Sequence, residues 1–128
     1  MKHKAFLSFS TEDKPLVDRF REQLENDLDD LELLDYSIKG PFDFDWKIKC
    51  EEIIRDCGIT ICLIGQNTYK SEPVEWELRK SIELGKAIIA VYLEDTAVQL
   101  PKILRHYDIR PIDSDPNKVM DKLRDFAK

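Results

Sequence analysis

The sequence predicts an α/β fold in which a mostly parallel sheet of about five strands is covered by helices on both faces. Short apolar segments rich in β-branched and aromatic residues alternate with longer segments whose apolar residues recur every three or four positions. One short segment, residues 59–64, is apolar on both of its alternating faces, as in a central strand covered by helices on both sides. Strands that alternate with helices form right-handed crossover units and hence a parallel sheet.

The first strand and helix are predicted near the start of the chain. Residues 4–9 (KAFLSF) form a short apolar run that ends at Ser10, and its brevity and aromatic content favour a buried strand. Apolar residues then recur at helical spacing over residues 11–27. Ser10 can cap this helix, and Pro15 falls in the first turn, where its missing amide hydrogen costs nothing. We therefore expect a strand that leads directly into a helix.

A second strand and a second helix are expected before Gly58. The strand is predicted around residues 33–36, because the Gly40-Pro41 pair that follows interrupts regular structure. Helical spacing returns from Trp46 to Cys57. Gly58 is well placed to end this helix.

The middle of the chain predicts a strand, a loop, a helix and another strand. Residues 59–64 (ITICLI) form the central strand, and residues 65–71 form a polar loop. An apolar stripe at helical spacing follows, with Pro73 in the first turn and Gly85 at the end. Residues 86–93 (KAIIAVYL) have the composition of another buried strand.

The last part of the chain is predicted to form a helical turn, a short strand and a final helix. Residues 94–106 form a mixed connection in which residues 101–104 make a helical turn. Residues 109–112 are expected to form a last short strand. A final helix begins at Asp115-Pro116 and continues to the end.

The composition predicts a cytoplasmic globular protein with one domain over residues 1–128. Hydrophobic residues make up 42% and charged residues 36% of the chain, and a chain of this length builds one core. A net charge of -6 leaves no basic field for nucleic acid. The start lacks a signal-peptide pattern, and the longest apolar run is far too short to cross a membrane. We therefore expect neither nucleic acid nor a membrane as partner.

The cysteines and histidines predict no metal site. Cys50, Cys57 and Cys62 are odd in number and lack C-x-x-C spacing, which favours core residues in a reducing compartment over disulfides or zinc ligands. His3 and His106 are isolated, without an H-E-x-x-H pattern.

Ligands of parallel α/β sheets bind beyond the carboxyl ends of the strands. Glu77 follows the loop after the central strand by about one helical turn, at the edge of the apolar stripe. A carboxylate there can hold ribose hydroxyls and stabilise positive charge at an anomeric carbon. The alternative is a solvated helix glutamate, since Glu75 and Glu83 lie nearby. The loops expected to build a site are residues 9–13, residues 37–46, residues 65–74 and the segment from residue 94 onward.

Three stretches of the chain resemble TIR-like domains. They are FLSFSTED at residues 6–13, ITICLIGQNTYKS at residues 59–71 and VEWELRKSIELGKAIIAV at residues 74–91. The resemblance is strongest to the TIR-like (ThsB-type) proteins of bacterial Thoeris anti-phage systems, and it covers about residues 4–93 in order. It implies a three-layer, flavodoxin-like TIR-type fold.

The resemblance implies an NAD-consuming enzyme. In enzymatic TIR-like proteins, a glutamate in the first part of this helix is catalytic in cleaving the bond between nicotinamide and ribose, and Glu77 stands at the matching position. The Thoeris-type proteins resemble ADP-ribosyl cyclases, whose cyclic ADP-ribose-type product activates a separate effector protein. NAD is then a substrate and not a bound cofactor, which agrees with the absence of G-x-G-x-x-G and P-loop sequences.

The same resemblance implies several substrate-binding residues. Phe9, Ser10 and Thr11 match a loop that lines the nucleotide pocket, where an aromatic ring stacks on a base and hydroxyls meet phosphate or ribose. Ser10 can equally be a helix cap. Asp43 and Trp46 match the loop and helix start that face the catalytic glutamate. Trp46 can stack on a purine or nicotinamide ring, or pack in the core.

One position departs from the family pattern. The family usually has Trp four residues before the catalytic glutamate, and this chain has Pro73 there. Trp76, the remaining candidate for substrate binding, is adjacent to Glu77 instead. Adjacent helix positions point about 100° apart, so Trp76 does not simply replace the usual ring. The shape of the nicotinamide pocket is therefore expected to differ.

The sequence also bears on three other classes of function. A TIR-like interaction module that works by self-association without turnover is favoured by Pro73. A receiver-like signalling domain needs a phospho-acceptor Asp at the end of the central strand, but that strand ends in Ile64-Gly65. A hydrolase triad is not expected, because no G-x-S-x-G sequence occurs.

Overall fold

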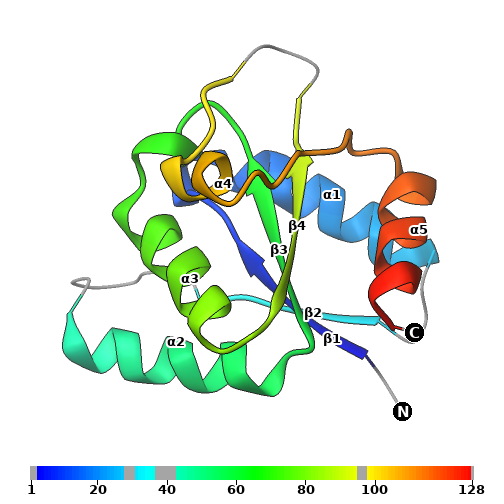
Figure 1. The fold of residues 1–128 in the computed structure, drawn as a ribbon. Coiled ribbons are helices and arrows are strands. Elements are labelled where there is room, and N and C mark those ends of the chain that lie inside the picture. The colour runs from blue at the N-terminus through cyan, green and yellow to red at the C-terminus, as the bar shows by residue number, and fades with distance from the viewer. Residues whose placement is uncertain (1–2, 28–30, 37–42, 95–97, 128) are drawn as a thin grey trace.

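A parallel sheet forms the centre of the structure, a computed structural model that describes residues 3–27, 31–36, 43–94 and 98–127. Its strands lie in the order β2-β1-β3-β4, so the chain starts in the middle of the sheet and moves outward on both sides (Figure 1). In the register, Ala5 lies beside Leu33 on one side and Ile59 on the other. The strands are β1 (His3–Ser8), β2 (Leu31–Leu34), β3 (Ile59–Ile64) and β4 (Ala87–Tyr92).

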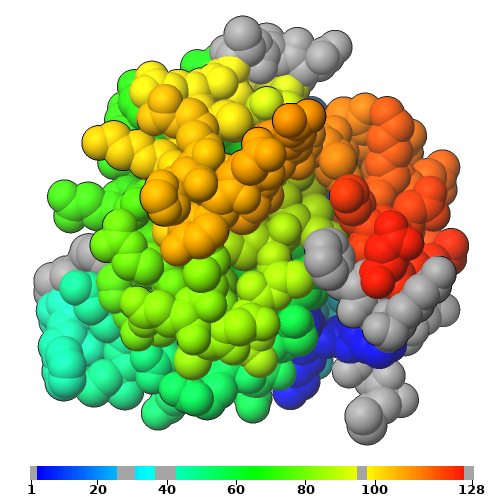
Figure 2. Space-filling model, in the orientation of Figure 1, coloured from blue at the N-terminus to red at the C-terminus, as the bar shows by residue number. Residues whose placement is uncertain are grey.

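Helices cover both faces of the sheet, which confirms the predicted fold class. Helices α1 (Lys14–Asp27) and α5 (Pro116–Ala127) pack on one face (Figure 1). The other face carries α2 (Phe44–Asp56), α3 (Glu72–Glu83) and α4 (Lys102–His106). In the space-filling view, α2, α3 and α4 form one continuous surface, and α5 lies at the opposite edge (Figure 2). Short 3₁₀ turns occupy Thr11–Asp13 and Thr68–Lys70.

The alternation of side chains along the strands produces two separate apolar layers. In β1, Ala5 and Leu7 pack toward α1 and α5, whereas Phe6 packs toward α2. The same alternation in β3 sends Ile61 to the first face and Cys62 to the second. The three cysteines are buried and free, as predicted.

The expected last strand is reduced to a single bridge. Among the described residues the sheet has four strands, and Ile112 alone pairs with Val91. The Ile112 amide donates to Ala90 O at 2.9 Å, and its carbonyl accepts from Tyr92 N at 2.8 Å. The start of the expected strand is tied to the end of α4 instead, because Ile109 N donates to Leu104 O at 2.8 Å.

The second strand begins and ends two residues earlier than expected. Leu31–Leu34 pairs with the first residues of β1, and Leu31 and Leu33 are the buried members of its alternation. Asp35 and Tyr36 therefore lie after the strand and not inside it. This shift brings both residues to the carboxyl edge of the sheet.

Within the described residues, every helix is too short or too polar to cross a membrane.

A glycine at the end of β3 allows a close contact with a buried carboxylate. A Cβ atom added at Gly65 would lie 2.5 Å from Cγ of Asp13. Asp13 is buried, and its carboxylate accepts from Asn67 Nδ2 at 3.4 Å and Thr68 Oγ1 at 3.3 Å, which limits its room to move.

We expect Gly65→Ala to lower the free energy of unfolding by about 1–3 kcal/mol, the usual cost of overpacking. The matched control is Gly58→Ala, where the nearest atom to the added Cβ is Lys4 O at 3.9 Å. The control should leave stability unchanged or raise it by a few tenths of a kcal/mol. Urea unfolding of both variants measures the difference, and equal stabilities would contradict the proposed clash.

Candidate active site

A pocket opens at the carboxyl edge of the sheet, where the loops after β1 and β2 meet the starts of α2 and α3. Its volume is about 40 Å³. A buried water needs roughly 10–15 Å³, so the pocket holds a few waters at most. Among the described residues that line it, aromatic rings and carboxyl groups predominate. The lining residues are Leu7, Phe9, Thr11, Asp35, Tyr36, Trp46, Ser71, Pro73 and Glu77.

Glu77 is held in place by the beginning of α3. Ser71 caps the helix, its Oγ accepting from Val74 N at 3.3 Å, and Pro73 occupies the first turn. Val74 and Leu78 are fully buried and fasten this face of the helix to the sheet. Glu77 shares the buried side and is 4% exposed. The solvated-glutamate reading of the sequence is therefore wrong.

Two side chains from other elements bind the carboxyl group of Glu77. Ser8 Oγ, at the end of β1, donates to Oε1 at 2.7 Å. Cys50 Sγ, on α2, lies 3.6 Å from Oε2. Ser81 Oγ donates to the backbone carbonyl of Glu77 at 2.8 Å and lies 2.7 Å from Thr60 Oγ1. The carboxyl group is thus oriented by three elements that meet at this point.

Burial makes the carboxyl group of Glu77 a weaker acid than an ordinary glutamate. Desolvation raises its pKa from the ordinary 4.5 to about 8, the hydrogen bonds from Ser8 and Cys50 lower it, and the negative charge of Asp35 raises it slightly. At neutral pH a carboxyl group with this pKa is mostly protonated. Burial and the nearby Glu77 also raise the pKa of the Cys50 thiol, so Cys50 is a poor nucleophile.

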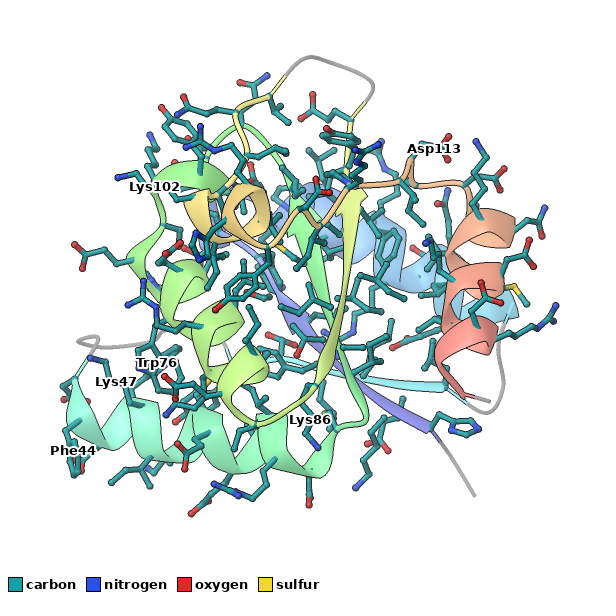
Figure 3. The ribbon with its side chains drawn as sticks, viewed as in Figure 1. Phe44, Lys47, Trp76, Lys86, Lys102 and Asp113 are labelled. Atoms are coloured by element: carbon teal, nitrogen blue, oxygen red, sulfur yellow. The ribbon has the colours of Figure 1, made fainter. Side chains whose placement is uncertain are left out.

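Aromatic rings form one wall of the pocket. Trp46 is 7% exposed, and its ring packs 5.9 Å from the Tyr36 ring centroid. On its other side, Trp76 contacts it edge-on at 5.6 Å, and Lys80 Nζ lies 5.6 Å from the Trp76 centroid. Trp76 lies where α3 meets α2, whereas Phe44 points outward from α2 (Figure 3). Trp46 therefore both packs in the core and borders the pocket.

Residues 6–98 match the model of one protein family, described as "Thoeris protein ThsB, TIR-like domain". The chain belongs to this ThsB TIR-like family. The match runs from within β1 to beyond the end of β4, and it includes every described residue that lines the pocket.

Solved structures of TIR domains share the fold of this ThsB TIR-like chain. The TIR domain of the Toll-related receptor TRR-2 from Hydra magnipapillata has a TM-score of 0.67 at 17% identity, over 97% of this chain and 98% of that one. A structure of the RPS4 and RRS1 TIR domain heterodimer has a TM-score of 0.64 at 13% identity, over 98% of each chain. No curated protein is similar enough in sequence to count as a relative.

An enzyme structure is also similar. The CMP N-glycosidase BcmB of Clostridium botulinum has a TM-score of 0.56 at 19% identity, over 94% of this chain and 98% of that chain. At such identities these structures show a common fold, and function has to be argued from the site itself.

The structure brings together four of the residues singled out in this ThsB TIR-like sequence. Phe9, Thr11, Trp46 and Glu77 line one pocket. Among the described residues, no group of His, Cys, Asp and Glu side chains is arranged to hold a metal ion.

The other three candidates have structural contacts outside the pocket lining. Ser10 is an N-cap, its Oγ accepting from Glu12 N at 3.4 Å. Asp43 caps α2, accepting from Trp46 N at 3.0 Å, and its side chain is exposed. Trp76 packs against Trp46.

Sequence reasoning missed Ser8, Asp35 and Tyr36. Asp35 and Tyr36 follow β2 directly, so a correct end for that strand would have placed them at the carboxyl edge, where ligands bind. Ser8 is the only hydroxyl in β1 on the same face as Phe6, and period-two alternation would have turned it toward α2 and α3.

Proposed function

We propose that this chain is an NAD-consuming enzyme that cleaves the bond between nicotinamide and ribose, with Glu77 as its catalytic residue. The observation that carries the proposal is a buried carboxyl group at the inner end of an aromatic-walled pocket, oriented by Ser8 and Cys50. Membership of the ThsB TIR-like family supports it. A protein of the same fold, titled a CMP N-glycosidase, supports N-glycoside chemistry in general.

In the proposed reaction, the bond between ribose C1′ and the nicotinamide nitrogen breaks, and its electron pair leaves with nicotinamide. The positive charge of the pyridinium ring passes to the ribose, which becomes oxocarbenium-like. An ionised Glu77 stabilises that charge and accepts hydrogen bonds from the ribose hydroxyls. The arriving cation favours loss of the Glu77 proton, because a nearby positive charge lowers the pKa of a carboxyl group.

The remaining pocket residues then have defined tasks. Phe9 and Trp46 provide apolar faces for the ring and the ribose, and the Thr11 hydroxyl is available to the substrate. Ser10, Asp43 and Trp76 act through the caps and packing that position this wall. Because the pocket is only about 40 Å³, the ribosyl pyridinium has to separate its walls on binding.

The fate of the ribosyl cation decides the product. Water yields linear ADP-ribose, whereas attack by the adenosine part of the same molecule yields a cyclic ADP-ribose-type signal. We propose the cyclic product and a separate effector protein that binds it, in line with the Thoeris family. Exclusion of water by the buried site favours the internal attack.

The test is incubation of the purified chain with NAD, with and without lysate from phage-infected cells, followed by mass spectrometry of nicotinamide and the products. Nicotinamide release supports the proposal, and the mass and retention time of the second product distinguish cyclic from linear. No release from folded protein under either condition would instead favour a non-catalytic assembly module. The RPS4 and RRS1 TIR domains, which share this fold, form a heterodimer, and sedimentation would then test self-association of this chain.

The pH dependence of kcat/KM separates two ways in which Glu77 can act. For NAD, whose leaving group already carries the positive charge, Glu77 has to be ionised, so kcat/KM should rise about tenfold per pH unit and level off above about 8. For a neutral base such as that of CMP, Glu77 would have to donate a proton, and the rate would fall above about 8. A profile for NAD that falls with rising pH would contradict the proposed role.

A further inference from the structure

The two oxygens of the Glu77 carboxyl group receive hydrogen bonds of unequal strength. Ser8 Oγ donates to Oε1 at 2.7 Å, a distance typical of a strong bond from a hydroxyl to a carboxylate. Cys50 Sγ lies 3.6 Å from Oε2, and a thiol is only a weak donor. Ser8 therefore makes the stronger of these two contacts.

The backbone around Ser8 fixes where its hydroxyl lies. Ser8 is the last residue of β1, and it pairs with Cys62 of β3 in the parallel register. Its side chain is fully buried, and Phe6, which shares its face of the strand, packs toward α2. Glu77 comes from the buried side of α3, so this hydrogen bond joins the sheet to the helix where Glu77 lines the pocket.

We propose that Ser8 is a positioning residue, whose hydroxyl holds Oε1 of Glu77 and favours the ionised carboxylate that the reaction needs. The inference rests on the proposed function in taking Glu77 as the group that stabilises the ribosyl cation. A hydrogen bond to an ionised group is roughly twice as strong as one between neutral groups. Ser8 thus opposes the desolvation that keeps Glu77 protonated, and it lowers the pH at which Glu77 becomes reactive.

Other titratable groups of the described chain also lie near Glu77. Cys50 of α2 and Cys62 of β3 are thiols whose pKa is raised by burial, so both stay neutral between about pH 6 and about pH 10. The negative charge of Asp35, after β2, raises the pKa of Glu77 and is unchanged in the variants below. Strand β4 and helix α4 pack apolar side chains against α3. A change in the pH profile on substitution of Ser8 therefore reports its hydrogen bond to Glu77.

Ser8→Ala removes this hydrogen bond and keeps the carboxyl group of Glu77. Loss of a hydrogen bond to a charged group corresponds to about one to two pH units, so the rise of kcat/KM for NAD should move upward by that amount. At pH 7, kcat/KM should fall about ten- to hundredfold, and the loss should shrink as the pH rises. The measurement is nicotinamide release by the wild type and the variant from about pH 6 to about pH 10.

Carbon-13 NMR follows the ionisation of Glu77 without turnover. The carboxyl signal of Glu77 is the one that disappears in Glu77→Gln, and its titration without NAD should show the same upward displacement in Ser8→Ala. Ser8→Cys, kept reduced, retains a weaker donor, so its titration should be displaced less than that of Ser8→Ala. Ser8→Cys also decides the question if Ser8→Ala does not fold.

Thr60→Val is the matched control. Thr60 is a buried hydroxyl residue in the neighbouring strand β3, and its Oγ1 lies 2.7 Å from Ser81 Oγ. Val has nearly the same shape and suits a strand. The midpoint of the Glu77 titration should stay at the wild-type pH in this variant, even where its stability is lower. Circular dichroism shows whether each variant is folded.

A Glu77 titration that is not displaced in Ser8→Ala or, where that variant does not fold, in Ser8→Cys overturns the proposal. So does an equal displacement in Thr60→Val. The outcome is separable from that of the proposed function. If the folded wild type releases no nicotinamide, the function fails, while the NMR titration still decides whether Ser8 favours the ionised Glu77. Release that depends on Glu77 but has the same pH profile in Ser8→Ala would leave the function standing and refute the role of Ser8.

Discussion

Nicotinamide release should fall by about 10²- to 10³-fold or more when Glu77 is replaced by Gln, the range measured for removal of one electrostatic stabiliser of a transition state. Gln has nearly the same shape and can still accept a hydrogen bond from Ser8 Oγ through its amide oxygen. It cannot carry the negative charge that balances the ribosyl cation. The loss should therefore appear in kcat, measured as nicotinamide released under saturating NAD.

Glu75→Gln is the matched control for this experiment. Glu75 lies on the same helix, but it pairs with Arg79 at 3.1 Å on the surface and does not line the pocket. It should retain normal turnover. Full activity in Glu77→Gln, or an equal loss in both variants, would remove Glu77 from the mechanism.

Replacing Glu77 by Gln should also make the fold more stable than the wild type at alkaline pH. Unfolded Glu77 loses its proton near the ordinary pKa of 4.5, whereas the folded chain keeps it until about 8. Between these values the unfolded state binds fewer protons than the folded state, so the free energy of unfolding falls as pH rises. Above about 8 the full penalty for a buried carboxylate is present. It amounts to roughly 5 kcal/mol for a pKa displaced this far, at 1.36 kcal/mol per pH unit.

Glu77→Gln has no carboxyl group at this position and should escape the loss. We expect its free energy of unfolding to exceed that of the wild type by a few kcal/mol more at pH 8.5 than at pH 4.5, as measured by urea unfolding across this range. Glu75→Gln keeps Glu77 and should follow the wild type. A difference between wild type and Glu77→Gln that does not change with pH would contradict the raised pKa of Glu77.

The periodicity of the sequence is enough to predict most of the fold. The central strand was predicted at residues 59–64 and is found at Ile59–Ile64, because six consecutive buried positions can be satisfied only between two layers of helices. The two ends of α3 are set by residues next to them in the chain. Ser71 and Pro73 mark its start, and Gly85 follows its end, so both ends can be located in the sequence itself. Glu77 could be chosen from its position after the central strand together with the family resemblance.

Elements that depend on distant partners were predicted less well. β2 was displaced by two residues because its ends are set by pairing with β1, not by its own short sequence. The expected strand at residues 109–112 became one bridge, because the chain at Ile109 is bound to the end of α4, at Leu104 O, and not to β4. That displacement of β2 concealed Asp35 and Tyr36, which the rule for ligands of parallel sheets would otherwise have indicated.

The sequence alone determined most of the succession of strands and helices along the chain, since their patterns relate near neighbours, whereas the choice of Glu77 as the candidate catalytic residue also needed the resemblance to TIR-like domains. The tertiary structure decided what surrounds that residue. Ser8 and Cys50 are 69 and 27 positions away from Glu77, and no local pattern relates them to it. The raised pKa of Glu77 exists only because β1, α2 and α3 together exclude water from its carboxyl group, and burial of that kind is a property of the assembled fold.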